Sequence, residues 1–167
     1  VSFKKEDGDD KPVEIVFSTK RTLEAAGGYG DKKVAALNFA NPIEPGGGVM
    51  YGAHAQEESI CRCSTLLPCL EDEYLMENFY LMHRENKRSG LMDNNYNDDC
   101  IYTPKVCVFK SDTLSPQLMD EDKWYWVDII TCAAPNLYRK SYFGDGSPKI
   151  NAEELKEMVA HSYLHRV

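Results

Sequence analysis

The chain has 167 residues, a formal net charge of −8 and 43% hydrophobic residues. This length favours one globular domain, and the hydrophobic fraction excludes a generally disordered chain. The chain has 27 acidic and 19 basic residues, and this acidic balance argues against a protein that binds DNA or RNA by neutralising phosphates. It does not exclude a local anion site built from backbone N–H groups, which needs no basic side chain.

No apolar run approaches the roughly 20 residues needed to cross a bilayer, so no membrane partner is expected. Residues 1–12 are strongly charged and lack the apolar core of a secretory signal, which predicts a solvated tail. The six cysteines are too sparse for a disulfide scaffold and favour buried free thiols in the cytoplasm. Cys61 and Cys63 have no matching second pair of ligands, so no metal site is expected.

Strand-like and helix-like patterns alternate along the first part of the chain. Residues 13–17 are rich in β-formers, and residues 22–26 have a helical composition that a glycine pair ends. The near-continuous apolar run at 33–39 is typical of a strand covered on both faces. Two prolines and four glycines exclude regular structure at 41–52.

A helix is predicted to begin at residues 54–56 and to run to Leu70, with a break at Pro68. The remaining segments are, in order, a helix at 72–88, a polar loop at 84–99, an extended segment at 100–110 whose proline favours an edge or a bulge, a strand at 123–134, a loop at 141–149 and an amphipathic helix at 151–167. This alternation predicts an α/β layered fold over residues 13–167.

Three consecutive glycines, Gly46, Gly47 and Gly48, follow the predicted strand at 33–39. Glycines permit positive φ and close approach of a ligand, and N–H groups at a strand-to-helix turn can bind an anion. The alternative is a flexible loop without a ligand. No G-K-[ST] follows, which excludes a P-loop, and the G-x-G-x-x-G spacing of dinucleotide-binding folds is absent.

Gln56, Glu57 and Glu58 follow the glycines after a short spacer. Adjacent carboxylates repel each other, which raises the pKa of one of them, whereas a helix N-terminus lowers it. A carboxyl group between these influences can act as a general acid and then as a base, as the hydrolysis of a glycosidic bond requires. The alternative is that the two acids only stabilise the first turn of a helix.

The segment PGGGVMYGAHAQEES resembles the signature of poly(ADP-ribose) glycohydrolases, in which GGG, a short spacer and QEE follow one another. The flanking sequences VAALNFANPIEPGGGV, ICRCSTLLPCL and VDIITCAAPNL resemble the bacterial-type branch of that family, from about Val13 to Asn136. The resemblance implies a macrodomain-like catalytic domain, a three-layer α/β/α fold with a mixed, mostly parallel sheet.

The resemblance also implies a role for each matching residue. Glu58 would be the catalytic acid and base, Glu57 would hydrogen-bond the ribose hydroxyls, and Gln56 would help to shape the loop. Asn41 matches an asparagine that reaches the distal ribose, and Asn38 matches it less closely. Backbone N–H groups of the loop would pass along the diphosphate and the distal ribose: those of Gly46, Gly47, Gly48 and Val49.

The family carries a second glycine-bearing loop of the form G-A-[WF]-G-C-G, which this sequence lacks. Its absence predicts a domain that is incomplete at its C-terminus, with the remainder in further sequence or in a second polypeptide. Residues 133–136 lie at the carboxyl end of a predicted strand, where α/β sheets place ligands, and are a further candidate for ligand contact.

The implied reaction is release of ADP-ribose from poly(ADP-ribose), without a cofactor or a catalytic metal. The same site would also serve to remove mono-ADP-ribose from protein side chains, or to bind ADP-ribose without catalysis. In the remaining alternative the chain is a structural fragment whose glycine loop is only a turn.

Overall fold

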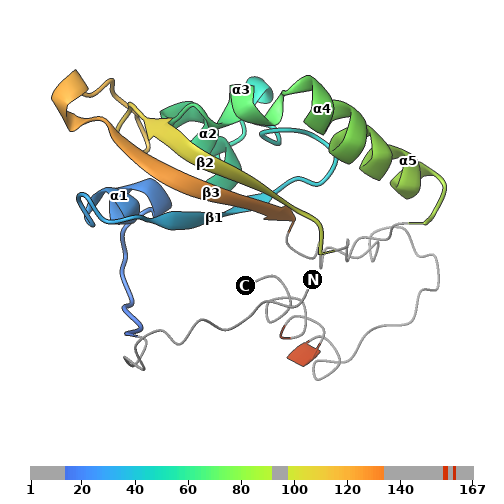
Figure 1. The fold of residues 1–167 in the computed structure, drawn as a ribbon, viewed down its shortest axis with the longest axis horizontal. Coiled ribbons are helices and arrows are strands. Elements are labelled where there is room, and N and C mark those ends of the chain that lie inside the picture. The colour runs from blue at the N-terminus through green and yellow to red at the C-terminus, as the bar shows by residue number, and fades with distance from the viewer. Residues whose placement is uncertain (1–13, 92–97, 134–155, 158–159, 161–167) are drawn as a thin grey trace.

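A three-stranded mixed sheet forms the centre of the structure, a computed structural model that describes residues 14–91, 98–133, 156–157 and 160 (Figure 1). The sheet order is β1–β3–β2, in which β1 is Ala35–Ala40, β2 is Cys100–Val108 and β3 is Tyr125–Ala133. Strand β1 pairs parallel with β3, and β2 pairs antiparallel with β3. The strands predicted at 33–39 and 123–134, the extended segment predicted at 100–110 and the α/β class are therefore confirmed.

The helices pack on one face of this sheet. Helix α1 is Thr22–Gly27, α2 is Gln56–Cys63 and α3 is Leu66–Leu70; α1 and α2 contact β1, and α3 contacts β2 (Figure 1). Burial of apolar side chains between these layers is the main stabilising term of such a core. The core is made of Leu23, Ala26, Ile60, Cys61, Cys63, Leu66, Leu70, Tyr80, Ile101, Val106, Val108, Val127 and Ile129.

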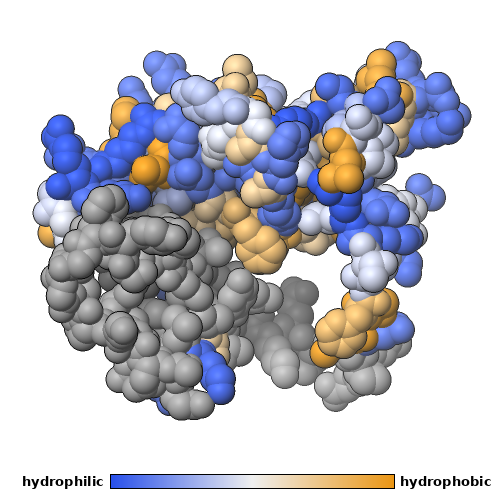
Figure 2. All heavy atoms as spheres, turned by 180° about the vertical axis from the view of Figure 1, so that it is seen from behind, coloured by the Kyte–Doolittle hydropathy of each residue, from blue (hydrophilic) through white to orange (hydrophobic). Residues whose placement is uncertain are grey.

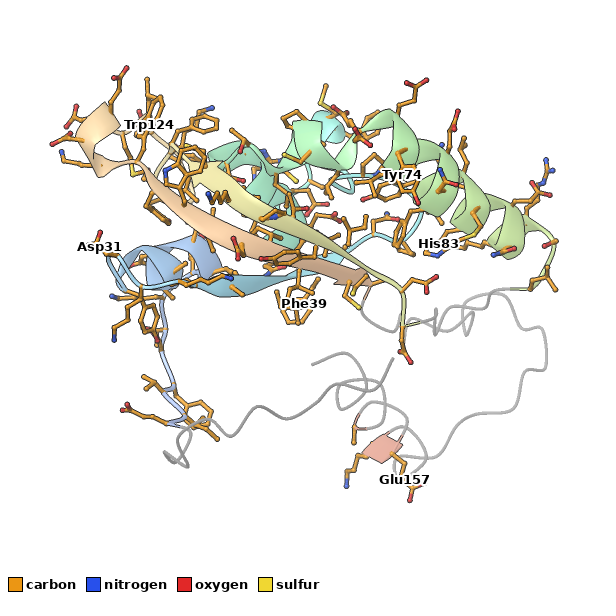
Figure 3. The ribbon with its side chains drawn as sticks, viewed as in Figure 1. Asp31, Phe39, Tyr74, His83, Trp124 and Glu157 are labelled. Atoms are coloured by element: carbon orange, nitrogen blue, oxygen red, sulfur yellow. The ribbon has the colours of Figure 1, made fainter. Side chains whose placement is uncertain are left out.

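The opposite face of the sheet is open over the described residues. Phe39 is 45% exposed, Tyr102 55% and Trp126 65%, and Figure 3 shows Phe39 pointing away from the helices. The prediction that the strand at 33–39 is covered on both faces is therefore wrong for the part of the chain that the structure describes. An apolar run reports the hydrophobicity of both faces, but not whether a second layer covers each of them.

The helix predicted at 72–88 is present as three joined pieces. They are α4 (Glu73–Leu75), the π-helical turn η2 (Met76–Leu81) and α5 (Met82–Arg88). Asp72 caps the first piece, because its side chain accepts a hydrogen bond from the N–H of Tyr74 at 3.0 Å. The polar loop begins only after Arg88, so the prediction of a loop from residue 84 started it too early.

The helix predicted from 54–56 to Leu70 breaks at Ser64 and Thr65 rather than at Pro68. The N–H of Thr65 donates to the carbonyl of Cys107 at 2.9 Å, which joins the chain to β2 at this point. Pro68 lies in the first turn of α3, where its missing N–H removes no helical hydrogen bond.

The β-rich run predicted at 13–17 forms no strand over its described residues. Ile15, Val16 and Phe17 are 76%, 64% and 95% exposed, and Figure 2 shows this segment as an orange group apart from the main body. Side chains with β propensity form a strand only where a neighbouring strand completes the backbone hydrogen bonds, so the prediction is wrong here. The tail at 1–12, the loop at 141–149 and most of the helix at 151–167 lie outside the described residues.

The proline of β2 produces the expected irregularity. Strand β2 lies at an edge of the sheet, and its register with β3 shifts between Thr103 and Val106. Lys105 has a φ of 53° there, and its N–H donates to Asp128 Oδ1 at 2.9 Å. The prediction that the proline favours an edge or a bulge is confirmed over the described residues.

All six cysteines are free thiols, and Cys61, Cys63, Cys107 and Cys132 are buried. The preference for buried free thiols over a disulfide scaffold is therefore confirmed for most of them. Over the described part of the chain, no helix has the length and apolarity that crossing a bilayer requires.

Candidate active site

The glycine loop, residues 41–52, connects the carboxyl end of β1 to the amino end of α2 (Figure 1). At this end β1 lies parallel to β3, and the last pair of the ladder is Ala40 with Ala133. Ligands of α/β sheets bind beyond the carboxyl ends of parallel strands. The loop closes with the short 3₁₀ turn η1 (Val49–Tyr51), which Gly52 ends.

The middle of the loop lies directly over the two carboxylates. Gly46 and Gly47 have φ of +67° and +58°, a region that side chains with a Cβ rarely adopt. A Cβ on Gly47 would lie 2.6 Å from Glu58 Oε1 and 3.0 Å from Glu57 Oε2. Glycine is therefore required at position 47 both by the backbone conformation and by the carboxylates beneath it.

Glu57 is a buried carboxyl group in the first turn of α2, with 3% of its surface exposed. Its Oε2 accepts a hydrogen bond from the N–H of Asn41 at 2.7 Å, and its Oε1 accepts one from the Asn38 amide at 3.5 Å. Burial raises the pKa of Glu57 to about 7; the hydrogen bonds from Asn41 and Asn38 oppose the rise, and the charge of Glu58 adds to it. The prediction of one raised pKa is confirmed, but burial is a larger cause than repulsion.

Glu58 is also buried, with 7% of its surface exposed, but it is bonded differently. Its Oε1 accepts from the N–H of Gly48 at 2.9 Å. Its Oε2 is buried without a hydrogen-bond partner among the described residues. Of the two acids, Glu58 thus has the carboxylate oxygen that is not shared with the protein, as exchange of a proton with a ligand atom requires.

The central N–H groups of the loop, at residues 47–49, already donate hydrogen bonds to other groups of the protein. Gly47 N–H donates to the carbonyl of Glu44 at 3.0 Å, and Val49 N–H donates to that of Gly46 at 3.1 Å. Gly48 N–H is held by the carboxylate described above. The glycines alone suggest N–H groups that are open to an anion, whereas a diphosphate that bound these three groups would have to replace existing bonds.

Gln56 ties α2 to β1. Its Nε2 donates to the carbonyl of Leu37 at 2.7 Å, and its Oε1 accepts from the N–H of Phe39 at 2.8 Å. The same Nε2 lies 3.2 Å from the hydroxyl oxygen of Thr22 in α1. The side chain thus bonds the strand as a neighbouring peptide group would, and it fixes the start of the helix that carries both glutamates.

The two candidate asparagines contribute in different ways. Asn41 uses its side-chain oxygen inside the loop, where it accepts from the N–H groups of Ile43 and Glu44 at 3.0 and 3.1 Å. Asn38 is fully buried, donates to Thr131 Oγ1 at 3.2 Å and keeps its Oδ1 without a partner among the described residues. Asn38 therefore belongs to the site more closely than its sequence match indicated.

Tyr80 lies near enough to Glu57 to be affected by its charge, and the sequence did not mark it. It is fully buried in η2, and its hydroxyl has no hydrogen-bond partner among the described residues. Burial, with a smaller contribution from the charge of Glu57, raises the pKa of Tyr80 well above its usual range. Helical spacing identifies Tyr80 as a core residue and carries no information about its polar end.

The remaining candidates are only partly covered. Ala133 is buried at the end of β3, and the rest of the segment predicted at 133–136 lies outside the described residues. No three His, Cys, Asp or Glu side chains gather as metal ligands in the parts of the chain that the structure covers.

The sequence model of the family described as "Microbial-type PARG, catalytic domain" matches residues 2–111. The chain is similar to the solved poly(ADP-ribose) glycohydrolase (PARG) from Thermomonospora curvata, with 33% identity and a TM-score of 0.71 over 96% of this chain and 54% of that chain. It is also similar to that organism's enzyme bound to the inhibitor ADP-HPD, with 34% identity and a TM-score of 0.64 over 88% and 51% of the two chains.

The poly(ADP-ribose) glycohydrolase from Deinococcus radiodurans in complex with ADP-ribose is 31% identical to the chain, with a TM-score of 0.63 over 87% of this chain and 52% of that chain. No curated protein matches the sequence. The chain spans about half the length of the solved glycohydrolases that it matches.

Proposed function

This chain belongs to the microbial-type PARG catalytic-domain family, and we propose that it forms part of an enzyme that hydrolyses ribose–ribose glycosidic bonds of poly(ADP-ribose) and releases ADP-ribose. The observation that carries the proposal is the pair of buried glutamates beneath the glycine loop, one of which keeps a carboxylate oxygen without a hydrogen-bond partner in the described part of the chain. The complex of the Deinococcus radiodurans enzyme with ADP-ribose supports this class of ligand.

In the proposed reaction Glu58 acts first as an acid and then as a base. Its protonated carboxyl group gives a proton to the oxygen of the leaving ribose, while the bond from that oxygen to the anomeric carbon breaks. Positive charge develops on the sugar that remains bound. A water oxygen then bonds to the anomeric carbon and passes its proton to the Glu58 carboxylate, which restores the acid.

Glu57 would hold the sugar rather than exchange the proton. Because its pKa is about 7, the carboxyl group is protonated in a substantial fraction of molecules at neutral pH. A group in this state can donate a hydrogen bond to one ribose hydroxyl and accept one from another. Its contacts with Asn41 and Asn38 fix its direction, which supports a role in orientation.

The glycine loop would bind the rest of the nucleotide. In this proposal backbone N–H groups of residues 46–49 bond the diphosphate and the distal ribose, and the side chain of Asn41 reaches the same ribose. Neutral N–H groups suit a chain whose net charge is −8, because they hold phosphate without basic side chains. Gln56 keeps the helix N-terminus in place beneath the loop.

The test compares the full-length protein with its Glu58→Gln variant on poly(ADP-ribose), with released ADP-ribose measured by chromatography. Loss of a general acid and base should reduce release at least about 100-fold, while binding of ADP-ribose by calorimetry stays within about threefold. Glu77→Gln is the matched control, because Glu77 is exposed on η2. This variant should release ADP-ribose at the wild-type rate.

The outcomes separate the alternatives. Absence of release by the wild-type protein, together with release from arginine-, serine- or glutamate-linked mono-ADP-ribose, would favour a hydrolase of modified proteins. Tight binding of ADP-ribose without any turnover would favour a binding protein. On the leading proposal the enzyme works in the cytoplasm, where the six free cysteines would remain reduced.

A further inference from the structure

The first part of the glycine loop is held by two neighbouring side chains of α5 that lie 41 residues further along the chain. His83 Nδ1 is 3.0 Å from the carbonyl oxygen of Pro42. Arg84 Nε donates to the carbonyl of Ile43 at 2.7 Å, and Arg84 Nη2 donates to the carboxylate of Glu44 at 2.8 Å. Three successive loop residues are thus each bonded to the helix.

His83 is itself fixed by its surroundings. It is 1% exposed, its ring lies 4.1 Å from the Phe79 ring, and its Nε2 is 3.0 Å from Asp99 Oδ2. Figure 3 shows it on the side of the helix that faces the sheet. The carbonyl of Pro42 and the carboxylate of Asp99 are both acceptors, so the ring satisfies both when each of its nitrogens carries a hydrogen.

We call the contacts of His83 and Arg84 with residues 42–44 the clamp. The residues that it holds connect directly to the two glutamates on both sides. Before them, the N–H of Asn41 donates to one of the two glutamates. After them, the carbonyl of Glu44 accepts from the N–H of Gly47, and the next N–H, of Gly48, donates to the other glutamate. A change in the clamp therefore reaches both carboxylates through one hydrogen bond or one peptide unit.

We propose that His83 and Arg84 are positioning residues that hold the glycine loop in its ligand-binding shape. Both residues act on the loop, through the carbonyl groups of Pro42 and Ile43 and the carboxylate of Glu44. The identity of the ligand rests on the proposed function, whereas the clamp rests on the contacts themselves. Because both residues act on the loop rather than on the bond that breaks, their loss weakens ADP-ribose binding more than it slows turnover of bound polymer.

The test uses Arg84→Ala in the full-length protein, with Arg88→Ala as the matched control. Arg88 lies one turn further along α5, is exposed and bonds Glu85 of the same helix. In Arg84→Ala, amide hydrogen exchange of the loop should be about tenfold faster and the Kd for ADP-ribose threefold to tenfold higher, since each lost hydrogen bond is worth a factor of that order. Arg88→Ala should change neither quantity by more than about twofold.

A conservative variant separates positioning from general stability. Arg84→Lys keeps one donor group and should restore part of the ADP-ribose affinity, whereas an effect of stability alone would not change the Kd of the folded protein. The proposal would be overturned if Arg84→Ala accelerated amide exchange in β3 as much as in the loop. It would also be overturned if that variant left the exchange in the loop or the Kd for ADP-ribose unchanged. If the wild-type protein does not bind ADP-ribose, the proposed function fails, and exchange in the loop alone decides whether the clamp exists.

Discussion

Replacing Gly47 by alanine should greatly reduce the rate of ADP-ribose release, while it lowers the stability of the fold only moderately. The new Cβ would lie 2.6 Å from Glu58 Oε1, whereas ordinary contact begins at 3.4 Å, so the carboxylate must move by about 0.8 Å. A displacement near 1 Å of a catalytic group is enough to reduce the rate about 100-fold. The second carboxylate, that of Glu57, would lie only 3.0 Å from the same Cβ.

The positive φ of Gly47 gives the alanine substitution a separate effect, on the stability of the fold. A residue with a Cβ at a φ of +58° destabilises the fold by about 1–2 kcal/mol. Gly30 provides a matched control, because its φ is +59° and no atom lies within 4 Å of an added Cβ. Gly30→Ala should therefore lose similar stability through its backbone while it keeps its activity.

Release of ADP-ribose and urea-induced unfolding, measured on both variants of the full-length protein, give the comparison. The expected result is a loss of activity of about 100-fold in Gly47→Ala and of less than threefold in Gly30→Ala. If Gly47→Ala kept activity within threefold of the wild type, the added Cβ would not displace the carboxylates. The reasoning from the short distance between Gly47 and Glu58 would then be refuted.

Two further predictions concern stability. The pKa of Glu57 rises from about 4.5 in the unfolded chain to about 7 in the fold, so its contribution is fully present below pH 4.5, falls by about 3 kcal/mol as the pH rises from 4.5 through 7, and changes no further above that. Urea unfolding at pH 5 and pH 8 should show a smaller fall for Glu57→Gln, and an equal fall would contradict the assignment. Tyr80→Phe removes a buried hydroxyl that has no described partner and should stabilise the fold by about 1 kcal/mol in the same assay. A loss of stability would contradict this reasoning, because it would mean that the hydroxyl makes a hydrogen bond.

The sequence predicted what short-range patterns determine. The apolar run that became β1 and the glycine loop after it lie next to one another in the chain, so their order alone brings the loop to the strand end. Gln56, Glu57 and Glu58 follow within a few residues, and a helix that starts there places them under the loop. These features need no knowledge of distant contacts.

Contacts between distant segments could not be predicted in this way. His83 and Arg84 read as ordinary polar residues near the end of a helical pattern, and nothing in that pattern shows that they meet the loop. The π-helical turn before them changes which face of the helix they occupy, because it holds more residues than an α turn. The β-rich run at residues 13–17 has the same difficulty, since its composition cannot report whether a partner strand lies beside it, and none does among the described residues.

Two adjacent glutamates in one sequence context differ in the hydrogen bonds that they make. Glu57 shares its oxygens with the N–H of Asn41 and the amide of Asn38, while Glu58 shares one oxygen with Gly48 and has no partner for the other among the described residues. In the proposed reaction a diphosphate that takes the Gly48 N–H releases the shared oxygen of Glu58 as well. Binding of the nucleotide would then leave both oxygens of the Glu58 carboxyl group without a hydrogen bond from the described residues.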